Sequence, residues 1–168
     1  MSTLIKDNKL TEDPFTRIGV DDAIPAQGAV LVPLATWQDH REKLLRRGEP
    51  VGVWLKSDEH PEIIAGDVNH LQLIALEFPT FRDGRGYSYA RLVRERYGFE
   101  GELRAVGDVL LEQLHYMGRV GFNAFEVDSE DALAELEIAA RDFSVWYQPS
   151  ADGRASSAQL RTELKRHG

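Results

Sequence analysis

The sequence predicts a single α/β domain in which short apolar strands alternate with helices around a mainly parallel, open sheet. A length of 168 residues suits one domain. Six short apolar segments alternate with five stretches of helical character, and this alternation favours parallel pairing through right-handed crossovers. A partial (βα) barrel fits the same pattern and is the alternative. Since six strands fall short of the eight in a closed barrel, we expect the open sheet.

The two ends of the chain differ in character from its middle. Near the start, two short apolar segments flank Asp7-Asn8-Lys9, which predicts a small hairpin, and Pro14 and Pro25 indicate irregular connections. The last twenty residues are rich in Ser, Arg and Gly. We therefore divide the chain into an N-terminal arm, an α/β domain and a C-terminal tail: residues 1–27, 28–148 and 149–168.

Apolar runs and helix stop signals place the elements of the domain. The predicted strands are residues 29–32, 51–55, 73–78, 103–106, 122–127 and 143–147. The predicted helices begin at the cap Thr36 and end at Gly48, cover about 61–71, follow the turn at 82–88 and end at Gly98, begin at Asp108 and end near Gly121, and cover about 133–140.

Composition excludes several classes of function. The formal net charge of −8 argues against a dedicated nucleic-acid-binding protein, which needs a basic face. The absence of cysteine excludes thiol catalysis, cysteine-ligated clusters and disulfides. The five histidines show no metal-ligand spacing. There is neither a signal peptide nor an apolar run of roughly 18 residues, so we expect a cytoplasmic protein without a membrane partner.

The most distinctive segment is an arginine-rich turn between a predicted strand and a predicted helix. Residues 81–96 hold five arginines and two acidic residues, a local charge of +3. Two glycines one residue apart let the backbone approach a ligand, and a helix start and guanidinium groups attract anions. We predict an oxyanion site for phosphate, sulfate or sulfite, formed by Arg82, Gly84, Arg85, Gly86, Ser88 and Arg91. Ser88 is either the helix N-cap or a ligand donor.

Plainer interpretations of this turn remain open. Arg82 or Arg85 could pair with Asp83 or Glu77 and only fix the loop, or the arginines could form a solvated helix face. Tyr89 stands where a dinucleotide fingerprint needs Gly or Ala, and no P-loop ending follows. The cofactor therefore stays unknown.

Carboxylates at the expected carboxyl ends of two strands are candidates for acid–base chemistry. In α/β folds ligands gather at this edge. Asp83 and Asp108 are the candidate catalytic residues. Asp108 fits equally well as a helix N-cap.

The same residues carry a family resemblance. The segments Phe78-Pro79-x-Phe81-x-Asp83-Gly84-Arg85-Gly86-Tyr87-Ser88-x-Ala90-Arg91, residues 101–110 and Arg119-x-Gly121-Phe122-x-Ala124-Phe125 resemble a bacterial family of unknown function, domain family 934. Its genes commonly accompany assimilatory sulfite reductase, and its members are described as candidate oxidoreductases of sulfite reduction. Arg82 and Asn123 stand where the family more often has a small polar residue and an acidic residue.

The resemblance implies a place in sulfur assimilation without implying a mechanism. We expect an accessory or electron-delivery protein whose turn binds an oxyanion or docks on sulfite reductase. One alternative is an enzyme acting on a small sulfur- or phosphate-bearing substrate. The other is a structural interaction module whose arginines form only a solvated face.

Overall fold

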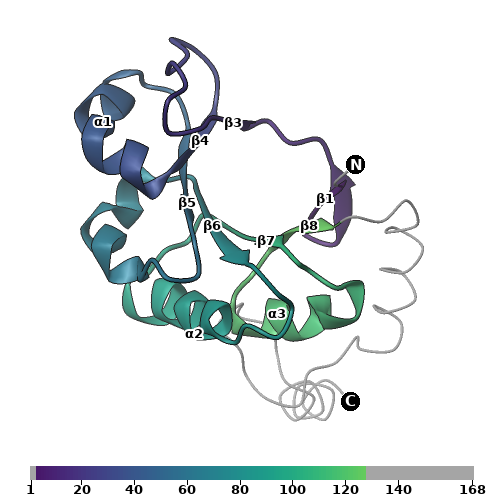
Figure 1. Ribbon diagram of the computed structural model, residues 1–168. Coiled ribbons are helices and arrows are strands. Elements are labelled where there is room, and N and C mark those ends of the chain that lie inside the picture. Colours follow the sequence, from purple (N-terminus) through teal and green to yellow (C-terminus); the bar gives the residue numbers. More distant parts are fainter. Residues whose placement is uncertain (1–2, 128–168) are drawn as a thin grey trace, which may run out of the picture.

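The computed structural model describes residues 3–127, which form a curled α/β sheet with helices on its outer side (Figure 1). Within this part of the chain the sheet has eight strands in the order β2-β1-β8-β7-β6-β5-β4-β3. All neighbours from β3 to β8 are parallel, and β1 is antiparallel to β2 and β8. The predicted α/β domain with a mainly parallel open sheet is confirmed, and its curvature makes the sheet a half-barrel.

The strands are short and mostly apolar, as expected of a parallel sheet. Their bounds are β1 (Thr3–Lys6), β2 (Lys9–Thr11), β3 (Thr16–Arg17), β4 (Val30–Pro33), β5 (Val51–Leu55), β6 (Leu73–Phe78), β7 (Glu102–Gly107) and β8 (Ala124–Val127). The strands predicted at 29–32, 51–55, 73–78, 103–106 and 122–127 are therefore confirmed to within two residues at each end. The strand predicted at 143–147, the helix at 133–140 and the tail lie outside the described residues.

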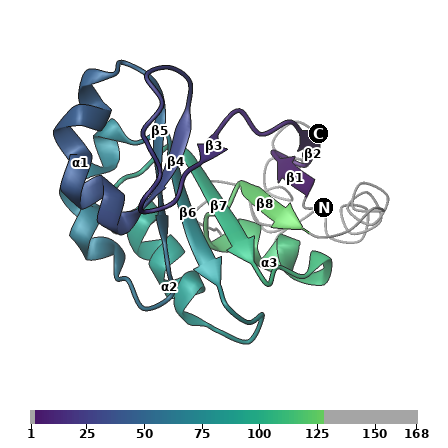
Figure 2. The ribbon, with the colours of Figure 1, turned by 45° about the horizontal axis from the view of Figure 1, so that its top comes forward.

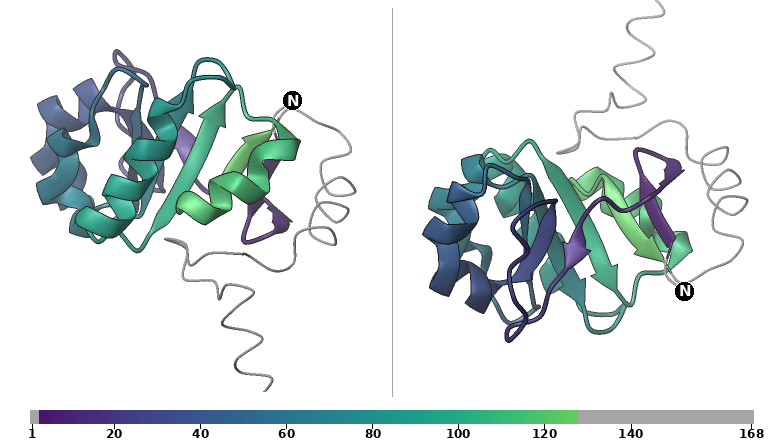
Figure 3. Two further views of the ribbon diagram at one scale, coloured as in Figure 1. Left: turned by 90° about the horizontal axis from the view of Figure 1, so that it is seen from below. Right: turned by 90° about the horizontal axis from the view of Figure 1, so that it is seen from above.

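Helical segments cover the outer side of the sheet (Figure 3). They are α1 (Leu34–Arg46), the 3-10 helix η1 (Pro61–His70), α2 (Arg85–Arg91), the π-helix η2 (Leu92–Arg96), the 3-10 helix η3 (Leu111–Gln113) and α3 (Leu114–Val120). Gly48, Gly98 and Gly121 have positive φ close to helix ends, as their prediction as stop residues requires. Among the described residues, no helix is both long enough and apolar enough to cross a membrane.

Two predicted helix starts are wrong. The N-cap of α1 is Pro33, because the helix begins as soon as β4 ends. Thr36 therefore lies in the first turn of α1, where it is buried. Asp108 does not begin a helix either: its N–H donates to Phe78 O at 2.7 Å, and the next helical turn, η3, begins only at Leu111. Asp108 thus continues the interaction of β7 with β6.

The predicted hairpin near the start is confirmed as β1 and β2. Asp7 and Asn8 both have positive φ, at 51° and 65°, as expected of a tight hairpin turn. The hairpin joins the sheet through β1, which lies beside β8 (Figure 2). Residues 12–15 then run from β2 at one edge of the sheet to β3 at the other edge, and so cross the open side of the half-barrel (Figures 1 and 3).

Side-chain alternation along the strands produces two apolar clusters. On the outer side, residues such as Val53, Ile74 and Leu103 pack beneath the helices in the main core. On the inner, concave side the cluster is small: Leu31, Leu73, Ala75 and Val106, with Phe15 and Trp54 against them. The inner side also carries charged side chains, which form a network described below.

Candidate functional site

The turn between β6 and α2 exposes an aromatic ring and a guanidinium group side by side. Phe81 has 36% of its surface exposed, and the Cζ atom of Arg82 lies 5.4 Å from the centre of its ring. Asp108, at the end of the neighbouring β7, accepts a hydrogen bond from the Phe81 N–H at 2.9 Å. Phe81 and Arg82 are therefore presented to solvent on a backbone that a second strand end fixes.

The Arg85 side chain forms hydrogen bonds with Asp83 and Ser57. Its Nη2 atom lies 2.6 Å from Asp83 Oδ2 and 3.0 Å from Ser57 Oγ, and its Nε atom lies 3.0 Å from Asp83 Oδ1. The Arg85 N–H also donates to Asp83 Oδ1. These contacts match the loop-fixing alternative drawn from the sequence, and Asp83 supplies the charge that balances Arg85.

This pair alters the ionisation of the Asp83 carboxyl. The hydrogen bonds from the Arg85 side chain and backbone hold the pKa of Asp83 at about 2, below the usual 3.8. The same hydrogen bond raises the pKa of Arg85. Asp83 therefore stays an anion at physiological pH, whereas a general acid must carry a proton there.

Replacing Arg85 with glutamine should raise the pKa of Asp83 toward its ordinary value. Since the lowered pKa stabilises the fold above the unfolded-state value and this contribution is lost as the pH falls toward 2, the variant should also lose part of the acid dependence of stability. An NMR pH titration of the Asp83 side chain measures the shift. The same pKa in both proteins would contradict the assignment to Arg85.

The carboxylate of Asp108 serves the turn rather than a helix. Its Oδ2 accepts the N–H of Phe81, so the predicted N-cap role is wrong. Cross-strand pairing is the reason: Phe78 and Gly107 are partners in register, which brings the residues that follow β6 and β7 together. Asp83 and Asp108 thus both hold the Phe81–Arg85 segment in place.

Of the two glycines in the turn, Gly86 is required by packing and Gly84 is not. Gly84 has a φ of −79°, and a side chain there would meet open space. Gly86 lies in α2, where a Cβ atom would fall 2.4 Å from the Phe78 ring. Neither of these two glycines adopts a positive φ. The left-handed glycine at this edge is Gly107, with a φ of 91°.

The remaining residues of the predicted anion site lie farther along α2. Gly84 is the N-cap, so Ser88, an exposed residue in the middle of the helix, cannot be the cap that the sequence suggested. Arg91 is exposed at the end of α2. The structure thus gathers Arg82, Gly84 and Arg85 in the turn and carries Ser88 and Arg91 away along the helix.

Comparison with known families places the chain. A model of the family described as "Bacterial protein of unknown function (DUF934)" matches residues 52–158. The chain belongs to the DUF934 family. Among curated proteins, none matches the sequence. The matched region includes β5 without its first residue, β6 to β8 and every residue of the turn, and it leaves out the N-terminal segment that crosses the half-barrel.

The inner side of this DUF934 half-barrel holds polar contacts that sequence reasoning missed. Trp54 donates its Nε1–H to Glu77 Oε2 at 3.0 Å, and the Arg17 guanidinium lies 4.7 Å from the Trp54 ring centre. Beside them, Arg104 is completely buried among three carboxylates. The available signal was a lone arginine within an otherwise apolar strand, Leu103-Arg104-Ala105-Val106. Within residues 3–127, no group of three His, Asp or Glu side chains is arranged to hold a metal ion.

Proposed function

We propose that this DUF934 protein is an accessory or electron-delivery protein of assimilatory sulfite reduction and that its β6–α2 turn docks on the reductase. The process comes from the family resemblance carried by residues 78–91, 101–110 and 119–125. The docking role rests on the exposed Phe81–Arg82 pair. Aromatic residues and arginine are enriched in protein interfaces and dominate their binding energy.

The geometry of the turn favours docking over chemistry at this edge. Phe81 and Arg82 point to solvent, while the two candidate catalytic carboxylates are engaged in hydrogen bonds that fix the backbone. Tyr116, on α3, is also exposed, and its ring packs 5.1 Å from that of Tyr87 on α2. A partner that covers the turn would find rigid aromatic groups there, which lose little conformational freedom on binding.

Oxyanion binding at the turn is the second candidate function, and Arg82 is the observation that favours it. Within residues 3–127 the Arg82 guanidinium has a ring contact and no ion pair. It could therefore bind a sulfite or sulfate ion without displacing a carboxylate. Arg85 could do so only by leaving Asp83, so the predicted site would depend on Arg82 more than on Arg85.

Deleting the gene should impair growth on sulfate or sulfite and leave growth on cysteine normal. An Asp108→Asn variant should restore growth almost as well as the wild type, because the amide oxygen can still accept the Phe81 N–H. An acid–base role for Asp108 predicts no restoration, since the amide cannot transfer a proton. Reduction of sulfite by the purified protein with NADPH, in the absence of the reductase, would overturn the accessory role.

A further inference from the structure

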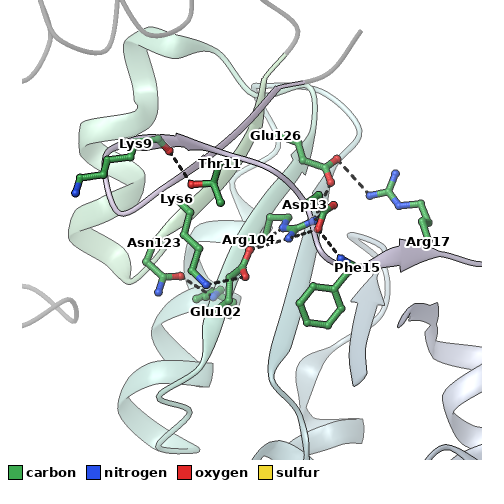
Figure 4. A network of polar contacts seen from close by, with 11 residues as sticks. Lys6, Lys9, Thr11, Asp13, Phe15, Arg17, Glu102, Arg104, Asn123 and Glu126 are labelled. Carbon is green, nitrogen blue, oxygen red and sulfur yellow. Dashed lines mark hydrogen bonds and ion pairs between the residues drawn. The ribbon is translucent and has the colours of Figure 1, made fainter. Parts of the chain in front are cut away.

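Arg104 lies at the centre of an ionic network on the inner side of the half-barrel (Figure 4). Its register partners on β6 and β8 are Ala75 and Ala124, whose small side chains leave room for the guanidinium along the sheet. Its Nη2 lies 2.8 Å from Glu102 Oε1, and its Nη1 lies 3.2 Å from Glu126 Oε1. These two carboxylates belong to the sheet, as Arg104 does.

The third carboxylate comes from outside the sheet. Asp13 places Oδ2 2.8 Å from Nη1 and Oδ1 3.0 Å from Nη2 of Arg104. In this bidentate geometry a guanidinium binds a carboxylate or another oxyanion most strongly. Asp13 belongs to the segment of residues 12–15 that crosses from one sheet edge to the other. Asp13 therefore occupies the position of an oxyanion ligand on Arg104.

Exposure distinguishes Asp13 from the other two carboxylates. The Asp13 side chain is 33% exposed, whereas those of Glu102 and Glu126 are 4% and 17% exposed. Asp13 is therefore the carboxylate of the three that is most accessible to solvent, while the Arg104 side chain is fully buried. Asp13 is also the one carboxylate of the three that lies outside the strands, between β2 and β3.

The charges of the network also fit one displaceable anion. Lys6 pairs with Glu102 at 3.3 Å, and Arg17 pairs with Glu126 at 3.4 Å. With Asp13 in place, three cations face three anions and the sum is 3 − 3 = 0. Without it the sum is 3 − 2 = +1, so one singly charged oxyanion restores neutrality.

We propose that Arg104 is an oxyanion-binding group of the inner side and that Asp13 is its built-in occupant, which a small carboxylate or sulfur oxyanion displaces. Displacement frees residues 12–15 from the open side of the half-barrel. Because Asp13 is part of the same chain, its effective concentration is high and binding to the wild type is weak. This site is separate from the β6–α2 turn and does not depend on the proposed docking function.

The Asp13→Asn variant tests the site directly, with acetate and sulfite as probes. The asparagine keeps the size of the side chain and removes the competing charge, so both probes should bind at least about tenfold more tightly than to the wild type. Glu12→Gln is the matched control, because it removes an exposed carboxylate from the neighbouring position. If calorimetry shows that Asp13→Asn binds acetate and sulfite no more tightly than Glu12→Gln does, the proposal is overturned.

A double variant separates this site from the turn. The protein that carries both Asp13→Asn and Arg82→Ala should bind acetate and sulfite as tightly as Asp13→Asn alone. If the double variant loses the gain in affinity, the anion binds at the turn and the proposal is overturned.

Hydrogen exchange of the wild type gives a test that needs no altered protein. The Phe15 N–H donates to Asp13 Oδ1 at 3.0 Å, so displacement of Asp13 removes its acceptor. Sulfite should speed exchange at Phe15 relative to sodium chloride of equal ionic strength. If Asp13→Asn fails to fold, this measurement decides alone, and unchanged exchange overturns the proposal.

Discussion

Replacing Arg104 with methionine should destabilise the protein by about 3–5 kcal/mol, the range for removing one partner of a buried ionic network. Methionine fills much of the same volume, so the loss is chiefly electrostatic. Asp13, Glu102 and Glu126 would face one another without the guanidinium between them. Burial by itself would lower the pKa of Arg104, but its hydrogen bond with Asp13 and the charge of Glu102 outweigh burial and raise it.

Urea denaturation at neutral pH measures this effect. Arg46→Met is the control: Arg46 is largely exposed on α1 and pairs only with Glu42 among the described residues, so its loss should change stability by less than about 1 kcal/mol. Equal effects of the two variants would show that the network contributes nothing special to the fold.

Replacing Gly107 with alanine should destabilise the protein by about 3 kcal/mol or more. At a φ of 91° the side chain is strained, and its Cβ would lie 2.3 Å from the carbonyl oxygen of Phe78. That oxygen belongs to the backbone of β6 and also accepts the Asp108 N–H. It cannot move aside without disturbing the pairing of β6 with β7, so the strand ends that hold the turn would separate.

Two glycines of the turn serve as graded controls for Gly107→Ala. Gly84→Ala should change stability by less than about 1 kcal/mol, because the negative φ and the open space suit alanine, although alanine is a poorer N-cap than glycine. Gly86→Ala should cost about 1–3 kcal/mol, since the Cβ meets the Phe78 ring, a side chain that can shift. Thermal denaturation of the three variants should reproduce this order. A destabilised Gly84→Ala beside a tolerated Gly107→Ala would contradict the geometry at this edge.

The sequence was informative about elements whose pattern is local. Runs such as Val51–Leu55 and Leu73–Phe78 are mostly apolar over the length of a strand, and Gly98 and Gly121 end helices, so both kinds of feature were predicted. The role that the N-terminal residues play in the sheet was not predicted. The segment at Thr16–Arg17 is too short to show a pattern, and its pairing with β4 depends on the curvature of the whole sheet.

The same distinction holds for the candidate site. The turn was found because its arginines and glycines are adjacent in the sequence, but the choice of partner for Arg85 depended on rotamers that no pattern specifies. The position of Asp108 required the register between β6 and β7. Arg104 and Asp13 are 91 residues apart, and nothing in the sequence near either one indicates that they meet.

Binding of the purified protein to purified sulfite reductase tests the proposed function most directly. The wild type should bind, and Phe81→Ala and Arg82→Ala should each weaken binding at least about tenfold, as truncation of an interface anchor does. Arg46→Ala, which removes an exposed arginine from α1, should bind like the wild type. No binding by the wild type, or equal binding by all four proteins, would contradict docking through the β6–α2 turn.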